Sequence, residues 1–250
     1  MKINGVIPAR WGSTRFPGKA IAIIAGKPMI QRVIERAIQA KSLNSVIVAT
    51  DDQRIVDIVE KINIPNLFVS LTRPDHPTGT DRIAEIIDDY PADIYVNIQG
   101  DEPLIEPELI DLISEPLTMN QWHMSTAVSP LNKRNDINNP SIVKAIFDSD
   151  NKALYFSRHP IPYIREDENN FLEETYWRHI GIYGYKKEFL KKLVQTPPCL
   201  IENAEKLEQL RALHIGGHIR IIKTNDCGIG VDTPKDLSKV EKIIEERNLV

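Results

Sequence analysis

The chain has few cysteines and no long apolar stretch. Its 250 residues include only Cys199 and Cys227, too few for a disulfide framework or a cysteine-rich metal site. We expect two reduced thiols, in keeping with a cytoplasmic protein. No apolar run approaches the roughly 20 residues that a membrane-spanning helix needs. A strand is predicted almost at the N-terminus, so we expect no signal peptide.

Strong charge of either sign is also missing. The formal net charge is -4, and no basic tail is present, so a nucleic-acid partner is not expected. Hydrophobic residues make up 42% and charged residues 26% of the chain, as in ordinary globular proteins. The length suits one large domain, or one domain with a sizeable insertion.

Acidic residues are absent before Glu35, and cations gather in that region. Arg10, Arg15 and Lys19 fall within one segment, Ile7–Lys19, which is rich in Gly, Ser and Thr and follows a short apolar run. Backbone N–H groups, hydroxyls and cations together are suited to hold a polyphosphate. The alternative is a surface turn that happens to be basic. Its position after the first strand, where α/β sheets bind ligands, favours the phosphate site.

This segment does not match the two familiar phosphate-binding motifs. Gly12 and Gly18 enclose five residues rather than the four of a Walker A loop, and Ala20 replaces its Ser or Thr. The glycines also miss the spacing of the dinucleotide-binding fingerprint.

Strand and helix patterns alternate in the first half of the chain. Strands are predicted over Asn4–Pro8, Ser45–Thr50, Leu67–Leu71 and Asp93–Ile98, and helices over Pro28–Lys41, Asp52–Ile62 and Gly79–Tyr90. This order predicts an α/β fold with a mostly parallel sheet and helices on both faces.

The second half is less regular and predicts a mixed or antiparallel extension. Strands are predicted over Met124–Val128, Ile142–Asp148, Ala153–Ser157, His179–Tyr185 and Ile219–Lys223, and helices over Lys186–Gln195 and Ala204–Ile215. Residues 165–175 are acidic and Asn-rich and predict a mobile loop. A last helix runs from an N-cap at Thr233, with Pro234 at N1 and Asp236 in a capping box, to about Asn248.

Two carboxylates suggest a metal beside the phosphate loop. Asp101 follows a predicted buried strand, and Asp232 precedes the last helix. A carboxylate in the same crevice as Arg10 and Lys19 would repel a polyphosphate unless a cation lay between them. Mg²⁺ accepts one or two carboxylates together with phosphate oxygens. The alternative makes Asp101 a turn former and Asp232 a residue next to a helix cap.

The motifs resemble those of the sugar-acid cytidylyltransferases, in particular the branch acting on 3-deoxy-manno-octulosonate (Kdo). The matching segments, in the family's order, are IPARWGSTRFPGK at 7–19, QGDEP at 99–103, ALYFSR at 153–158, RHIGIYGY at 178–185, LEQLR at 207–211 and GVDTP at 230–234. The resemblance covers the whole chain. Phe16 and Ala20 depart from the usual Leu and Pro.

The resemblance implies a single domain over 1–250 with a Rossmann-like nucleotidyltransferase fold. It implies a smaller mixed-strand subdomain for dimerisation and sugar binding within about 125–200. The implied reaction is CTP plus Kdo giving CMP-Kdo and pyrophosphate, for lipopolysaccharide biosynthesis. The implied enzyme is Mg²⁺-dependent, homodimeric and cytoplasmic.

The resemblance also assigns site residues. The catalytic group comprises Arg10, Lys19, Asp101 and Asp232, of which the two aspartates hold Mg²⁺. The nucleotide-binding group comprises Pro8, Ala9, Arg10, Ser13, Thr14, Arg15, Lys19, Arg73, Thr78, Gly79 and Gln99. The sugar-binding group comprises Arg158, Arg165, His179, Tyr183, Glu208 and Gln209. On the residues alone, Glu208 and Gln209 also fit the solvated flank of a helix, and His179 fits an ordinary strand position.

Two other functions stay open. One is a cytidylyltransferase for an 8-amino Kdo analogue or another acid sugar such as sialic acid. The other is a nucleotide-binding sensor without catalysis, against which the retention of both Asp101 and Asp232 argues.

Overall fold

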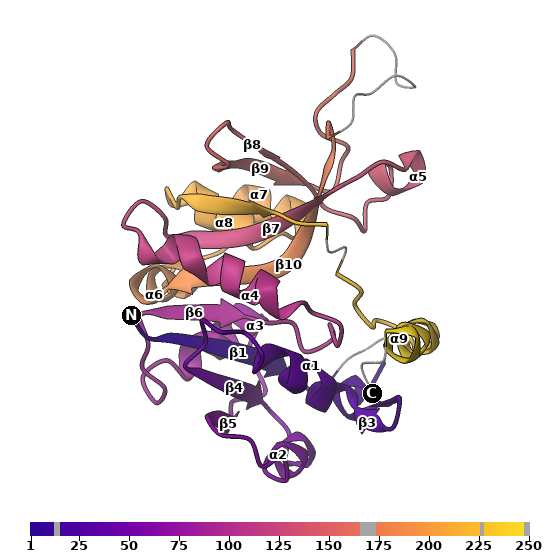
Figure 1. The fold of residues 1–250 in the computed structure, drawn as a ribbon. Helices are drawn as coiled ribbons and strands as arrows, with labels where there is room; N and C mark the ends of the chain where they lie inside the picture. The colour runs from indigo at the N-terminus through magenta and orange to yellow at the C-terminus, as the bar shows by residue number, and fades with distance from the viewer. Residues whose placement is uncertain (13–15, 166–173, 226–227, 248–250) are drawn as a thin grey trace. The chain divides into compact units, whose positions relative to one another are not determined.

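The computed structural model describes residues 1–12, 16–165, 174–225 and 228–247 (Figure 1). The chain forms two compact units. Unit 1 comprises Met1–Glu115 and Gly228–Val250, and unit 2 comprises Pro116–Cys227. None of the helices in these ranges combines the length and apolarity needed to cross a bilayer.

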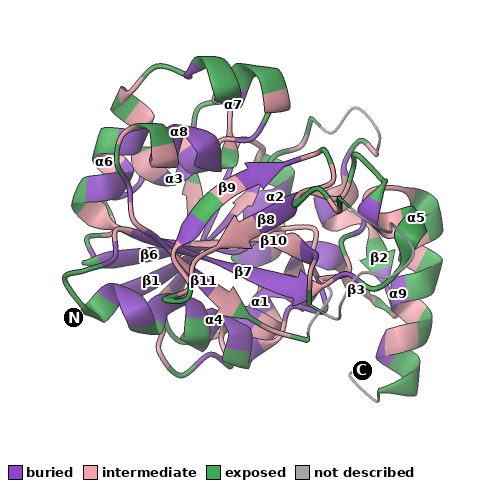
Figure 2. Ribbon diagram, turned by 90° about the horizontal axis from the view of Figure 1, so that it is seen from above, coloured by how far each residue is buried: buried purple, intermediate pink, exposed green. Residues whose placement is uncertain are grey.

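Unit 1 contains a parallel sheet in the order β6-β1-β4-β5. Its strands are β1 (Ile3–Ala9), β4 (Ser45–Thr50), β5 (Leu67–Leu71) and β6 (Ile94–Asn97). The continuous apolar runs of β1 and β4 are buried because helices cover both faces of the sheet. In Figure 2, α1 (Met29–Ala37) and α4 (Pro107–Ser114) lie on one face, and α2 (Gln53–Val59) and α3 (Gly79–Glu85) on the other. The predicted α/β arrangement is confirmed.

The helices of unit 1 are shorter than predicted. The predicted helix to Tyr90 was wrong beyond Glu85. The hydroxyl of buried Tyr95 lies 3.0 Å from the carbonyl oxygens of Ile87 and Tyr90, so these carbonyls serve a tertiary contact rather than a helical turn. Helix α4 was not predicted, although Pro107 at N1 precedes buried Leu109, Ile110 and Ile113.

The remaining elements of unit 1 are short, apart from the last helix. They are η1 (Lys19–Ile21), the hairpin β2 (Ile23–Ile24) and β3 (Lys27–Pro28), and α9 (Pro234–Glu246). The capping box at the start of α9 is confirmed: the Thr233 backbone N–H donates to the Asp236 carboxylate at 2.9 Å.

Unit 2 contains a mixed sheet, as predicted. β7 (Met124–Pro130) pairs antiparallel with β10 (Trp177–Lys186) and parallel with β11 (Ile219–Lys223). β8 (Lys144–Phe147) pairs antiparallel with β9 (Ala153–Ser157) and with β10. The register of β10 against β7 shifts between Ile180 and Tyr183. The expected subdomain at 125–200 falls within unit 2, and its roles stay predictions. Of the predicted mobile loop, 166–173 lie outside the described residues, as does Cys227. Cys199 is a buried free thiol.

The helices of unit 2 are η2 (Glu115–Thr118), which starts in unit 1, α5 (Arg134–Ile137), α6 (Lys187–Gln195), α7 (Leu200–Glu205) and α8 (Gln209–His214). The prediction of one helix over Ala204–Ile215 was wrong. The chain breaks at Lys206, whose φ of 53° is left-handed. A buried ion pair joins the two short helices: Arg211 donates twice to Glu202, at 2.7 and 2.9 Å.

Glu202→Ala should lower the free energy of unfolding by about 3–5 kcal/mol, because it leaves the buried Arg211 guanidinium without its counter-charge. The double variant Glu202→Leu/Arg211→Met should recover most of that loss, because no charge is then buried alone. Urea denaturation of the three proteins measures both effects. A single variant as stable as the wild type would show that the pair does not join the helices.

Candidate active site

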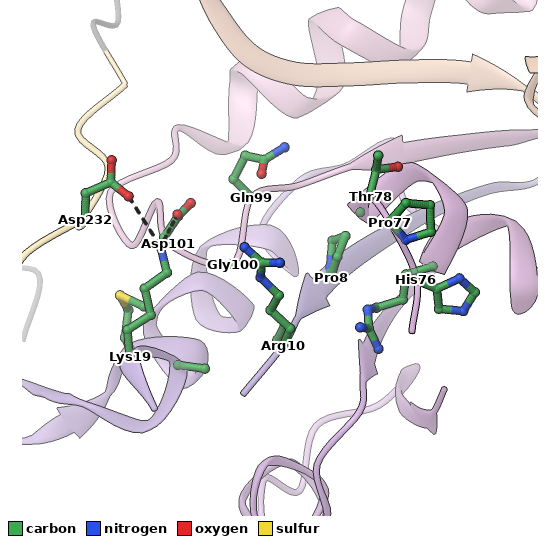
Figure 3. A pocket seen from close by; sticks show the side chains of 15 residues that line it. Pro8, Arg10, Lys19, His76, Pro77, Thr78, Gln99, Gly100, Asp101 and Asp232 are labelled. Atoms are coloured by element: carbon green, nitrogen blue, oxygen red, sulfur yellow. Dashed lines mark hydrogen bonds and ion pairs between the residues drawn. The ribbon is translucent and has the colours of Figure 1, made fainter. Parts of the chain in front are cut away.

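A cavity of about 330 Å³ opens in unit 1, where β1 and β6 end (Figure 3). Its position agrees with the rule that open α/β sheets bind ligands beyond the carboxyl ends of their strands. Nine predicted site residues line it: Pro8, Ala9, Arg10, Lys19, Thr78, Gly79, Gln99, Asp101 and Asp232. The fold therefore brings together residues that are more than 200 positions apart in the sequence.

Close backbone approach shapes the cavity near Pro8. A Cβ atom at Gly100 would lie 2.8 Å from the Pro8 carbonyl oxygen, closer than van der Waals contact permits. A Cβ at Gly79 would lie 3.4 Å from the Pro8 ring. Gly100 therefore lets the turn after β6 pass directly over the end of β1, which places Asp101 at the cavity.

Lys19 lies between the two aspartates. Its Nζ is 2.5 Å from Oδ2 of Asp101 and 3.6 Å from Oδ1 of Asp232 (Figure 3). The Val231 backbone N–H donates to the Asp101 carbonyl at 2.8 Å, which fastens the segment before α9 to the turn after β6. Two carboxylates thus converge on one cation, as they would on a metal ion.

The donors present suit Mg²⁺ in number and chemistry. Among the described residues, no group of three or more His, Cys, Asp or Glu side chains could hold a metal. Two carboxylates remain, and Mg²⁺ is often held by one or two carboxylates, completing its octahedron with water and phosphate oxygens. The ammonium of Lys19 marks the point where a cation satisfies both aspartates.

Other predicted nucleotide-binding residues are not part of the described cavity wall. Arg73 is 68% exposed, with its Nε 3.8 Å from Asp75 and 3.9 Å from Glu85, and it is not among the lining residues. Its role stays a prediction. Ser13, Thr14 and Arg15 lie outside the described residues.

Sequence reasoning did not assign six of the lining residues to the site, and three of these six come from one segment of the chain: His76, Pro77 and Arg82. The ring of His76 is hydrogen-bonded to Glu85. Burial alone would raise the pKa of Glu85, but hydrogen bonds from His76 and the Arg73 backbone hold it below its ordinary value. The signal for all three was their place in the segment 73–82, which also contains Thr78 and Gly79.

His179 in unit 2 is held as a neutral ring. Its Nε2 is 2.9 Å from the Thr126 hydroxyl, and its ring contacts Phe156 and Tyr183. Burial, with a smaller contribution from the Arg178 charge, lowers the pKa of His179 to about 3. The register shift in β10 separates His179 from Tyr183, and the two rings lie 5.4 Å apart. His179 is half-buried within β10, and its role in sugar binding stays a prediction.

Gln209 carries a buried donor without a partner. Only 3% of the residue is exposed, and its Nε2 has no hydrogen-bond partner within the described part of the chain. Its Oε1 is 3.5 Å from the Tyr183 hydroxyl. The solvated-flank interpretation is wrong for Gln209, whereas Glu208 is half-buried at the start of α8. An unpaired buried amide donor is costly, so a ligand oxygen would stabilise it.

The Arg158 guanidinium is hydrogen-bonded within the protein, whereas an arginine that binds a carboxylate keeps its N–H groups for the ligand. Its Nε donates to the Glu205 carbonyl at 2.7 Å and its Nη1 to the Pro140 carbonyl at 3.0 Å. These bonds tie β9 to the end of α7 and to the loop at 140. Arg165 is exposed and borders the undescribed residues 166–173. The roles of both arginines in sugar binding stay predictions.

A family model described as "Cytidylyltransferase" matches residues 5–222. The chain belongs to the cytidylyltransferase family. It is 47% identical over 248 residues to the 3-deoxy-manno-octulosonate cytidylyltransferase of Geobacter sulfurreducens, covering 96% of this chain and 98% of that protein. It is 43% identical over 252 residues to the Bdellovibrio bacteriovorus protein of the same name, covering all of both chains. The predicted branch of the family is confirmed.

Solved structures support the same family and fold. A CMP:2-keto-3-deoxy-manno-octonic acid synthetase complexed with CTP superposes with a TM-score of 0.92, at 39% identity over 99% of this chain and 100% of that one. A 4-diphosphocytidyl-2C-methyl-D-erythritol synthase from Anaerococcus prevotii has a TM-score of 0.65 at 14% identity, covering 98% of both chains, and shows the shared fold alone.

His179 generates a pH prediction. Its pKa is about 3 in the folded state and about 6.5 in an unfolded chain, so only the unfolded chain gains this proton as the pH falls below about 6.5. The free energy of unfolding should therefore fall as the pH is lowered. His179→Gln should reduce the slope of that free energy against pH by the equivalent of up to about one proton per molecule. Urea titrations from pH 7.5 to 4.5 measure this slope. His214→Gln, at an exposed position on α8, is the control and should keep the wild-type slope. Equal slopes for His179→Gln and wild type would contradict the neutral ring.

Proposed function

We propose that the chain catalyses transfer of CMP from CTP to the anomeric C2 hydroxyl of Kdo, giving CMP-Kdo and pyrophosphate for lipopolysaccharide biosynthesis. The family and the names of relatives over 40% identical support this substrate pair. The observation that carries the chemistry is the convergence of Asp101 and Asp232 on the Lys19 ammonium in the unit 1 cavity. A homodimer in the cytoplasm is part of the same proposal.

Charge neutralisation is the main task of the triphosphate site. Arg10 and Lys19 line the cavity and offer charged donors to phosphate oxygens. Asp101 and Asp232 alone would repel the triphosphate, and Lys19 offsets part of that repulsion. These two aspartates are the residues that would hold Mg²⁺. Bound to their oxygens, Mg²⁺ would supply Lewis-acid stabilisation of the charge that develops at the α-phosphate and the attacking oxygen.

The cytosine base needs donors at O2 and N3 and an acceptor at N4. Gln99 lines the cavity and carries both a donor and an acceptor. The backbone around Pro8 and Ala9 and the turn at Thr78–Gly79 form the neighbouring wall. We assign base and ribose binding to this wall.

The acid sugar needs hydrogen bonds to its hydroxyls, and unit 2 supplies neutral groups of that kind. Gln209 offers its unpaired Nε2, and Tyr183 lies beside it. His179 remains uncharged near neutral pH, so it exchanges hydrogen bonds without adding charge. We assign these three residues to the sugar site, together with Arg158, Arg165 and Glu208.

Pyrophosphate release tests the activity. The wild type should release pyrophosphate with CTP, Kdo and Mg²⁺, and Asp101→Asn or Asp232→Asn should lower the rate by about 10³-fold or more, because the carboxylate charge is lost. Each variant should also bind metal-free CTP more tightly than the wild type, because a negative charge leaves the phosphate site. Calorimetric CTP titrations with and without Mg²⁺ measure this. Glu60→Gln, an exposed acid at the end of α2, is the control.

The outcomes separate the alternatives. Release with an 8-amino Kdo analogue but not with Kdo would replace the substrate, and CTP binding without release from any acid sugar would indicate a sensor. An active Asp101→Asn enzyme would remove Asp101 from the metal site.

The base site generates a second prediction. ATP and GTP should each support less than about 1% of the CTP rate, because a purine presents different hydrogen-bonding groups to Gln99. Rates with each triphosphate at equal Mg²⁺ concentration measure this. A purine rate comparable to the CTP rate would contradict the assignment of the base wall.

A further inference from the structure

The two cations of the triphosphate site flank the segment Trp11–Gly18, whose two ends meet. Arg10 directly precedes Trp11, and Lys19 directly follows Gly18. The Gly18 backbone N–H donates to the Trp11 carbonyl at 3.2 Å, so the ends of the segment meet. Whatever fixes Trp11 therefore also fixes the spacing between Arg10 and Lys19.

The Trp11 ring contacts two partners. One is Gly18, in the left-handed region with a φ of 68°, where an added Cβ would lie 3.0 Å from the ring. The other is Arg54, whose guanidinium carbon lies 3.2 Å from the ring centroid. Asp52 holds Arg54 in place through a 2.6 Å ion pair.

The Trp11 backbone is held by Asp51. This residue directly follows β4, whose last residue, Thr50, pairs with Ala9. The Asp51 Oδ1 accepts the Trp11 backbone N–H at 2.9 Å. Its Oδ2 pairs with Arg82 at 3.0 Å, and the two side chains are only 11% and 4% exposed.

Arg82 is also held by the residues that follow β5. Its Nη1 donates to the Thr72 hydroxyl and to the Arg73 carbonyl. The Thr72 hydroxyl in turn donates to the Thr50 carbonyl at the end of β4. Arg82 also lines the triphosphate cavity. An unpaired carboxylate here would repel a bound polyphosphate, and its pairing with Arg82 removes that penalty while keeping an acceptor for Trp11.

We propose that Asp51 and Arg82 are positioning residues that hold Trp11 and thereby set the spacing of Arg10 and Lys19 for the triphosphate. The inference rests on the proposed function. It assigns a role in nucleotide binding to two residues beyond those in the predicted site. Their effect passes through the Trp11 backbone and ring to the two cations, and it concerns CTP rather than the acid sugar.

Steady-state kinetics of Asp51 variants tests this role. Asp51→Ala loses both contacts, whereas Asp51→Asn keeps an acceptor oxygen for the Trp11 N–H. The KM for CTP should rise in the order wild type, Asn, Ala, reaching about tenfold or more, because misplaced charged groups lose much of their effect. The KM for Kdo should stay within about twofold. Adding Arg82→Met to Asp51→Ala should raise the KM for CTP by less than the product of the single effects, because the two residues act as a unit.

Two further measurements separate positioning from general destabilisation. Gln53→Ala, at an exposed position on α2 whose side chain bonds Asp57, is the matched control and should keep the wild-type KM values. Amide hydrogen exchange at Trp11 should be faster in Asp51→Ala than in the wild type. Unchanged exchange, or equal increases in both KM values, would overturn the proposal. A wild type that neither binds CTP nor releases pyrophosphate would instead overturn the proposed function, and the exchange result would still decide whether Asp51 holds Trp11.

Discussion

The balance of charge at one edge of the parallel sheet is the constraint on which the site depends. Asp101 and Asp232 lie close enough to share the Lys19 ammonium, at 2.5 and 3.6 Å. Without that cation, two carboxylates on converging segments would push the turn after β6 away from the segment before α9. The Val231–Asp101 backbone bond forms only where these segments meet. The first loop, the middle and the end of the chain must therefore fold together before the cavity exists.

Two other acids of the described chain also pair with a cation of their own. Asp51 pairs with Arg82 and Glu202 with Arg211. Such pairs contribute little net stability, because desolvation offsets most of the attraction. What they contribute is geometry. One holds Trp11, and the other joins two helices that the left-handed Lys206 separates.

Local patterns predicted the strands of the fold better than its helix ends. The bounds of β4, β5, β9 and β11 were predicted to the residue, because apolar runs and turn residues are properties of short segments. Helix ends depended on distant partners. Helix α3 ends just before two carbonyls that hydrogen-bond to the Tyr95 hydroxyl. The place of Arg82 at the cavity was missed for the same reason. Its sequence neighbours predict only a helix, whereas its position depends on Asp51, 31 residues earlier.

The candidate sugar residues show why burial had to be known before chemistry was assigned. Glu208 and Gln209 are adjacent and polar, yet Gln209 is buried with an unpaired Nε2 while Glu208 is half-buried. A solvated amide would bind water at no cost. A buried unpaired donor costs about 1–3 kcal/mol until a ligand oxygen meets it. Such a donor rejects analogues that lack the matching hydroxyl more strongly than an apolar wall could. We therefore propose that Gln209, beside Tyr183, helps this enzyme to discriminate among acid sugars.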